Sequence, residues 1–151
     1  MSDMKSVLLL NGPNLNLLGT RKPEIYGKTT LSEIVADLEK QAKSKSLAFS
    51  HAQFNGEGEL ITAVQQARGQ HQGMIINAGG YSHTSIALRD AVEIFDGPVI
   101  EVHLSNLARR ESFRHHSYLS EVSSGVIFGM GPLGYRLALD ALEQMLFNSN
   151  S

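Results

Sequence analysis

The chain contains no cysteine and no tryptophan, and these absences exclude several kinds of site. Without cysteine there is no disulfide, no thiolate nucleophile and no cysteine-ligated zinc or iron–sulfur centre. Aromatic residues make up only 7% of the chain, which argues against a base-stacking platform for nucleic acid. Basic and acidic residues number 13 and 15, so neither sign of charge dominates and nothing indicates a nucleic-acid or membrane partner.

Long apolar runs are absent as well. No stretch approaches the roughly 20 apolar residues that a membrane-spanning helix needs, and Met1–Ser6 lacks the apolar core of a signal peptide. We therefore expect a cytoplasmic protein. The 151 residues show no repeat or linker and are 42% hydrophobic, so we expect residues 1–151 to form one domain.

Short apolar runs alternate with helical patterns along the whole chain. Strands are predicted at Val7–Leu10, Leu47–Gln53 (weaker), Met74–Ile76, Val99–Leu104 and Val126–Phe128. Helices are predicted after the capping box Thr30–Glu33 and at Glu59–Ala67, Ser85–Phe95 and Leu133–Phe147, the last with Leu137, Ala141 and Met145 facing inward. Residues 106–120 are polar and predicted to be irregular, with at most one short helix.

This alternation predicts an α/β fold in which a five-stranded parallel sheet carries helices on both faces. The length and strand count fit a flavodoxin-like three-layer sandwich with strand order 2-1-3-4-5. In such sheets, ligands bind beyond the carboxyl ends of the strands. The segments that follow these ends are rich in amides, a hydroxyl and two histidines, which suits a polyhydroxylated ligand: Asn11–Asn14, Asn55–Glu57, Asn77–His83 and Glu101–Asn106. The alternative is ordinary turn chemistry.

A long polar loop between Gly19 and Thr30 contains Tyr26. Loops of this length between a strand and a helix are often lids or binding loops. A nearby cation lowers the pKa of a tyrosine by favouring the phenolate, and Arg21 or Arg114 can supply it. Tyr26 is thus a candidate general base. The alternative is a loop tyrosine that packs over the rim.

His103 lies where the fourth predicted strand ends, and Glu101 lies two residues back on the same face. A carboxylate beside an imidazole fixes its tautomer and favours its protonated form. His103 is thus a candidate general acid, and the alternative is a structural histidine. Nearby, Arg109, Arg110 and Arg114 form a candidate carboxylate site together with Arg21, unless they form only a solvated charged face.

Three other patterns do not indicate a cofactor. Gly129–Gly134 matches G-x-G-x-x-G, but the chain ends before the acidic residue of a dinucleotide site, so we interpret it as a tight turn. His115 and His116 are adjacent and belong to no three-ligand set, so we expect no metal. No lysine follows a strand, which disfavours imine chemistry.

Three sequence blocks resemble the type II dehydroquinases (3-dehydroquinate dehydratases). The similarity runs over nearly the whole chain, from about Val7 to Leu146. The three blocks occur in the order and spacing of that family: Leu10–Arg21 with Glu24–Gly27, Asn77–Ser85 with Ala87–Asp90, and Glu101–Asn106 with Arg110–Arg114 and His116–Ser120. The resemblance implies a cofactor-free anti elimination of water from 3-dehydroquinate to 3-dehydroshikimate, through an enolate, in the shikimate or quinate pathway.

The resemblance also implies roles for individual residues. Tyr26 matches the base and Arg21 the residue that activates it, His103 matches the acid with Glu101 behind it, and Asn14 matches a residue that orders a water. Substrate contacts are matched by Asn77, His83, Asp90, Leu104, Ser105 and Arg114. Asp90 is expected to reach a neighbouring subunit's site in a homododecamer built as a tetramer of trimers. Phe54 and Gly56 depart from the family pattern, where Ser and His are common.

Two other functions remain as alternatives on the residues alone. One is a flavodoxin-like hydrolase that uses histidine or a metal. The other is a binding or signalling module, such as a flavin carrier or a receiver domain, although a receiver needs acidic residues where Asn11–Asn14 stand.

Overall fold

A computed structural model describes residues 4–20, 24 and 27–148. Five parallel strands form one sheet in the order β2-β1-β3-β4-β5. The strands are β1 (Ser6–Asn11), β2 (Ala48–Gln53), β3 (Gly73–Asn77), β4 (Val99–His103) and β5 (Gly125–Phe128). The predicted sheet and its strand order are confirmed.

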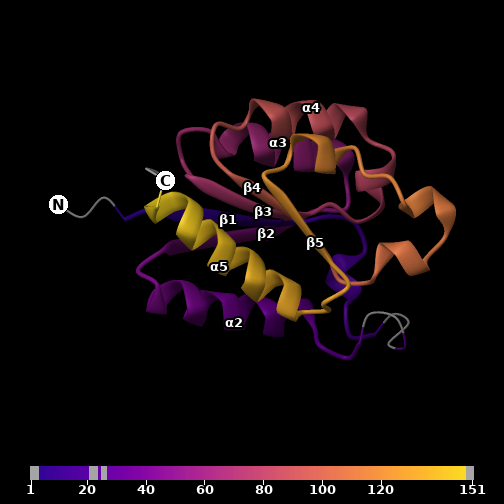
Figure 1. Ribbon diagram of the computed structural model, residues 1–151, viewed down its shortest axis with the longest axis horizontal. Coiled ribbons are helices and arrows are strands. Elements are labelled where there is room, and N and C mark those ends of the chain that lie inside the picture. The colour runs from indigo at the N-terminus through magenta and orange to yellow at the C-terminus, as the bar shows by residue number, and fades with distance from the viewer. Residues whose placement is uncertain (1–3, 21–23, 25–26, 149–151) are drawn as a thin grey trace.

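Helices cover both faces of the sheet, as predicted (Figure 1). On one face lie α2 (Leu31–Ser44) and α5 (Leu133–Phe147), and on the other lie α3 (Glu57–Ala67) and α4 (Ile86–Ile94). Each helix pair encloses its own buried apolar cluster against the sheet. Within the described ranges, no helix is both long and apolar enough to cross a bilayer.

The central strand β1 shows why the apolar runs become strands. Val7 and Leu9 contribute to the cluster under α2 and α5, whereas Leu8 and Leu10 contribute to the cluster under α3 and α4. Because successive side chains point to opposite faces, a strand covered on both sides must be apolar throughout. Strand β2 lies at the edge and is only half-buried, which explains its weaker sequence signal.

The predicted capping box starts α2. The Thr30 hydroxyl accepts a hydrogen bond from the Glu33 backbone amide at 3.2 Å, and the Glu33 carboxylate accepts one from the Thr30 amide at 3.0 Å. Two amides that lack a helical partner are thereby satisfied. The helix therefore begins at a fixed residue directly after the loop that contains Tyr26.

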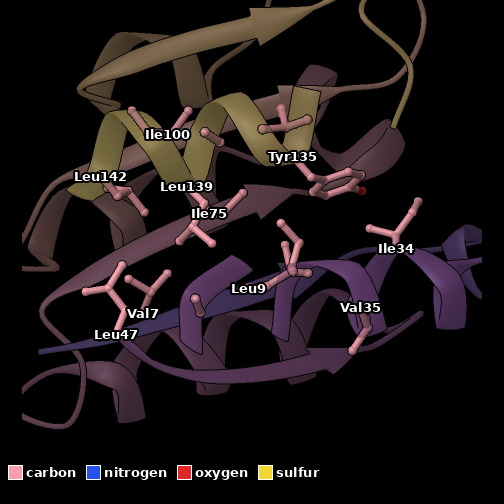
Figure 2. Close-up of a cluster of buried hydrophobic side chains, with 14 of the residues drawn as sticks. Val7, Leu9, Ile34, Val35, Leu47, Ile75, Ile100, Tyr135, Leu139 and Leu142 are labelled. Atoms are coloured by element: carbon pink, nitrogen blue, oxygen red, sulfur yellow. The ribbon is translucent and has the colours of Figure 1, made fainter. Parts of the chain in front are cut away.

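The predicted inward face of α5 was wrong in phase. Leu137 and Met145 are 38% and 39% exposed, and Ala141 is only partly buried. The buried face consists instead of Tyr135, Ala138, Leu139, Leu142 and Leu146 (Figure 2). Apolar residues occupy most of the circumference of this helix, so periodicity alone does not set which part of it is buried. In the structure Tyr135 is buried, and its hydroxyl forms hydrogen bonds with Asn77 and Asn11 in the sheet. These bonds set which face of α5 turns inward.

The segment after β4 contains three short 3-10 turns rather than one helix. They span Leu107–Arg109, Ser112–Arg114 and Leu119–Val122. The first two pack against each other, and the third packs against α4. This segment runs along one side of the molecule and returns to the sheet at β5 (Figure 1).

After β1 the chain forms β2 at one edge of the sheet. It then crosses back, so that β3 pairs with β1 on the opposite side and β4 and β5 follow beyond it. The carboxyl ends of β1 and β3 are adjacent, with Asn11 directly opposite Asn77. A parallel sheet opens a crevice at such a switch point. This crevice is where the fold positions a ligand site.

Two glycines give a matched test of the fold. A Cβ on Gly97 would lie 2.0 Å from the Gln72 carbonyl oxygen, whereas a Cβ on Gly58 in α3 would meet nothing within 4 Å. We expect Gly97→Ala to lower the free energy of unfolding by about 2 kcal/mol or more. Gly58→Ala should raise it by about 0.5 kcal/mol, because alanine loses less backbone entropy in a helix. Urea denaturation measures both, and equal effects would contradict the backbone packing at Gly97.

Candidate active site

A pocket of about 140 Å³ opens above the carboxyl ends of β1, β3 and β4. Its walls come from the loops after these three strands, at the predicted edge of the sheet. Most of the predicted site residues within the described ranges line it: Asn14, Asn77, His83, His103, Leu104, Ser105 and Arg114.

Glu101 lies beneath the pocket and is fully buried. Its Oε2 accepts hydrogen bonds from His103 Nε2 at 2.5 Å and from the Ser117 hydroxyl at 2.6 Å. Its Oε1 accepts one from the Ser120 hydroxyl at 2.5 Å. The carboxylate is therefore surrounded by donors from β4 and from the segment before β5. Sequence reasoning found His103 but not the two serines.

The ionisation of Glu101 is set by two opposing effects. Burial alone would raise the pKa of this carboxyl, because a charge is disfavoured away from water. The hydrogen bonds from His103, Ser117 and Ser120 outweigh burial, so the pKa lies below its ordinary value of 4.5. Glu101 is therefore a carboxylate at neutral pH and acts only as a hydrogen-bond acceptor.

This contact determines how His103 meets the pocket. An ionised carboxylate only accepts, so His103 Nε2 carries a proton and donates it to Glu101. The ring nitrogen that remains for a ligand is Nδ1. The ring is almost fully buried and stacks on His83, with ring centroids 5.9 Å apart.

His83 carries its proton on the other ring nitrogen. Its Nδ1 lies 2.8 Å from the His116 carbonyl oxygen, and because a carbonyl only accepts, Nδ1 carries the proton. Burial lowers the pKa of His83, the hydrogen bond to the His116 carbonyl raises it, and the electrostatic effects of His103 and Arg114 lower it further. His83 is therefore neutral, and its Nε2 is an acceptor. The pocket thus contains one histidine of each tautomer.

Asn14 occupies a left-handed backbone conformation with φ of 72°. The backbone amide of Asn14 donates to Asn55 Oδ1 at 3.1 Å, and Gln53 Nε2 donates to the same oxygen at 3.1 Å. Gln53 also donates to the Gly12 carbonyl at 3.0 Å. The turn after β2 therefore holds the turn after β1. Gln53 supports this turn from outside the pocket, a role that sequence reasoning missed.

The two departures from the family pattern lie on either side of this contact. Phe54 packs partly buried against the cluster under α3 and α4. Gly56 is the residue before α3, where a Cβ would meet only the flexible Glu59 carboxylate, at 2.8 Å. Neither residue lines the pocket. The side chains that hold the turn at Asn14 are those of Gln53 and Asn55, which are not among the departures.

The arginine cluster is divided by the fold. Arg114 and Arg110 line the pocket. Arg114 forms an ion pair with Glu111 at 2.8 Å, and Arg110 donates to the Ser105 hydroxyl at 3.2 Å. Arg109 lies outside the pocket, in a wider depression beside it. Two cations on one wall provide a site for an anionic group such as a carboxylate.

Arg21 and Tyr26 lie outside the described residues. Glu24 and Gly27, which flank Tyr26 in sequence, both line the wider depression. That depression shares Ser105 and Arg110 with the pocket.

Asp90 lies on α4, away from this pocket. Its side chain is 60% exposed and pairs with Arg89 at 3.2 Å. Ile86 and Ile94 are each 56% exposed on the same helix. These positions, four residues apart, form one stripe of apolar, acidic and apolar side chains.

The glycine-rich segment after β5 is a tight turn, as interpreted from the sequence. Gly129 and Gly131 have φ of 90° and 59°. Their amides donate to the carbonyls of His103 and Leu104, at 3.4 and 3.0 Å, so neither amide is directed at a phosphate. Among the described side chains, no group of three His, Asp or Glu residues is placed to hold a metal.

Comparisons with known proteins agree with one another. The family described as dehydroquinase class II matches residues 5–143. The chain is 55% identical to a 3-dehydroquinate dehydratase of Yersinia pestis over 150 residues, covering 99% of this chain and 100% of that protein.

Solved structures are similar over almost the whole chain. The type II dehydroquinase of Butyrivibrio crossotus has a TM-score of 0.91 at 40% identity, with 93% of this chain and 99% of that one covered. The type II dehydroquinase of Propionibacterium acnes has a TM-score of 0.90 at 42% identity, with 95% and 99% covered.

The serine donors to Glu101 provide a pH-dependent test. An ionised Glu101 whose pKa is depressed in the folded state stabilises the fold above pH 4.5, and this contribution is lost as the pH falls further. We expect Ser120→Ala to cost about 1–3 kcal/mol at pH 7, because a buried charge loses a donor. The cost should shrink below pH 4.5.

Ser123→Ala is the matched control, because the Ser123 hydroxyl donates to the Leu119 carbonyl and not to a titrating group. Its cost should not change with pH. Urea denaturation of both variants from pH 7 downwards tests this, and a pH-independent Ser120→Ala cost would contradict an ionised Glu101.

Proposed function

The chain belongs to the class II dehydroquinase family, and we propose that it removes water from 3-dehydroquinate to give 3-dehydroshikimate. This makes it a hydro-lyase of the shikimate or quinate pathway. The observation that carries the proposal is the buried Glu101–His103 pair, which lies beneath a pocket at the switch point of the family's fold. The cytoplasmic location stays a prediction, which cell fractionation would test.

The first step is removal of a proton next to the ketone. Such a proton is weakly acidic, so the site must supply a strong base and stabilise the resulting enolate. We assign the base to Tyr26 as a phenolate that Arg21 stabilises. The position of Glu24 and Gly27 beside the pocket supports a loop that presents Tyr26 to the substrate. Asn14 is assigned to a water that contacts the enolate oxygen, and its fixed backbone suits this task.

The second step is loss of the hydroxyl, which needs a proton. We assign that proton to His103 Nδ1, since Nε2 is held by Glu101. Glu101 fixes the direction of the ring and balances the imidazolium charge, without taking the proton itself. After transfer, His103 keeps its proton on Nε2, so it must regain the Nδ1 proton from the pocket side.

The remaining contacts suit a hydroxylated acid. Arg114 and Arg110 lie where they can bind the substrate carboxylate. His83 Nε2 accepts a hydrogen bond and therefore selects a hydroxyl group, while Asn77, Ser105 and Leu104 complete the wall. Base and acid both belong to the protein, so the proposed reaction uses no cofactor.

We propose a homododecamer, a tetramer of trimers, in which Asp90 reaches the site of a neighbouring subunit. Asp90 lies outside its own chain's pocket, in an exposed stripe between Ile86 and Ile94. Exposed apolar surface rimmed by polar side chains marks interaction sites when it is contiguous. The stripe therefore supports an acidic residue that acts across an interface.

Turnover of 3-dehydroquinate tests the assigned base and acid. Absorbance of the conjugated enone product should rise with wild type and with His51→Ala, a control on the exposed face of β2. Tyr26→Phe and His103→Ala should each lower kcat by about 10²-fold or more. Chelator and borohydride should have no effect on the wild-type enzyme. Full turnover by Tyr26→Phe would contradict the assignment of the base, and full turnover by His103→Ala would contradict that of the acid.

Mixed assemblies test the shared site. Asp90→Ala and His103→Ala chains should each be nearly inactive alone. Co-expressed, they should regain activity, because a site with its own His103 from one chain and Asp90 from the other is complete. Light scattering reports whether each variant assembles. Assembled hybrids without recovered activity would contradict a contribution of Asp90 across the interface.

A further inference from the structure

Three buried polar side chains connect α5 to the floor of the pocket. Asn11, Tyr135 and Asn77 are 1%, 0% and 3% exposed. Tyr135 belongs to the first turn of α5, and its ring lies at one end of the apolar cluster between α5, α2 and the sheet (Figure 2). Asn11 and Asn77 are the last residues of β1 and β3. Burial of polar groups at this depth requires that each finds a partner.

The direction of each hydrogen bond follows from one backbone amide. The Gly79 amide can only donate, and it lies 3.2 Å from Asn77 Oδ1, which fixes that atom as the oxygen. Asn77 Nδ2 is therefore the group that donates to the Tyr135 hydroxyl oxygen, at 2.9 Å. The Tyr135 proton is then donated to Asn11 Oδ1, at 2.7 Å.

This direction determines what Asn77 offers to a ligand. One Nδ2 proton is bound to Tyr135 and the oxygen is bound to Gly79. The second Nδ2 proton remains, and Asn77 lines the pocket. Burial raises the pKa of Tyr135, so its hydroxyl stays neutral and accepts from Asn77 throughout the working pH range.

We propose that Tyr135 is a positioning residue for substrate binding, which acts by orienting the Asn77 amide as a donor towards a substrate oxygen. The proposal rests on the proposed function. With the acceptor His83, which also lines the pocket, the site offers two neutral groups of opposite polarity. A substrate whose oxygens meet them in the other order would leave a buried donor or acceptor unpaired.

Tyr135→Phe is the direct test, because it keeps the buried ring and removes only the hydroxyl. Asn77 Nδ2 then loses its acceptor, and only the Gly79 amide still holds the side chain. We expect KM for 3-dehydroquinate to rise about tenfold while kcat changes less than about threefold, as for loss of a ground-state contact. Tyr118→Phe, which lies outside this network, should leave both constants unchanged.

A double-mutant cycle separates positioning from a structural role. If Tyr135 acts through Asn77, the pair Tyr135→Phe with Asn77→Ala should show the same KM as Asn77→Ala alone. A merely structural tyrosine would lower the folded fraction, and hence the apparent kcat, without raising KM. If Tyr135→Phe does not fold, Asn11→Leu removes the acceptor instead and should raise KM as well, because the hydroxyl can then turn towards Asn77.

The outcomes distinguish this inference from the proposed function. No wild-type turnover would remove the function itself. Wild-type turnover with an unchanged KM in Tyr135→Phe, or in Asn11→Leu where that is the folded variant, would overturn the positioning role. Effects of Tyr135→Phe and Asn77→Ala that multiply in the double variant would overturn it too.

Discussion

The constraint on which this site depends is the buried charge of Glu101. A carboxylate without exposure to water is costly unless it is paired and hydrogen-bonded. Here His103, Ser117 and Ser120 supply the donors. Two of them belong to the irregular segment between β4 and β5, so satisfying the charge also fastens that segment to the sheet. The same segment supplies the His116 carbonyl, which orients His83.

The polarity of the pocket follows from this arrangement. Glu101 commits one nitrogen of His103, and the His116 carbonyl commits the opposite nitrogen of His83. Tyr135 and the Gly79 amide bind both ends of the Asn77 side-chain amide. Each of these side chains therefore presents one defined hydrogen-bond donor or acceptor to a ligand. A site of this kind is preorganised, so little reorganisation is needed when charge develops during the elimination.

Much of the fold followed from local patterns. The apolar runs and glycine-bounded turns predict five strands, and the spacing of Glu101 and His103 places both side chains on one face of β4. The inward face of α5 was missed because apolar residues occupy most of the helix circumference, and the buried face depends on the long-range partners of Tyr135. Ser117, Ser120 and Gln53 carried no local signal, since serine and glutamine are ordinary surface residues and their role depends on the segment they meet. The tautomers of the two histidines depend in the same way on neighbours remote in sequence.

Nitrogen NMR of the imidazole rings reports which nitrogen of each histidine carries the proton, and therefore tests whether Glu101 is an ionised acceptor. We expect opposite ring nitrogens to be protonated in one spectrum: Nε2 of His103, which donates to Glu101, and Nδ1 of His83, which donates to the His116 carbonyl. A His103 whose neutral form carries its proton on Nδ1 would contradict the ionised Glu101 acceptor and the direction of proton transfer built on it.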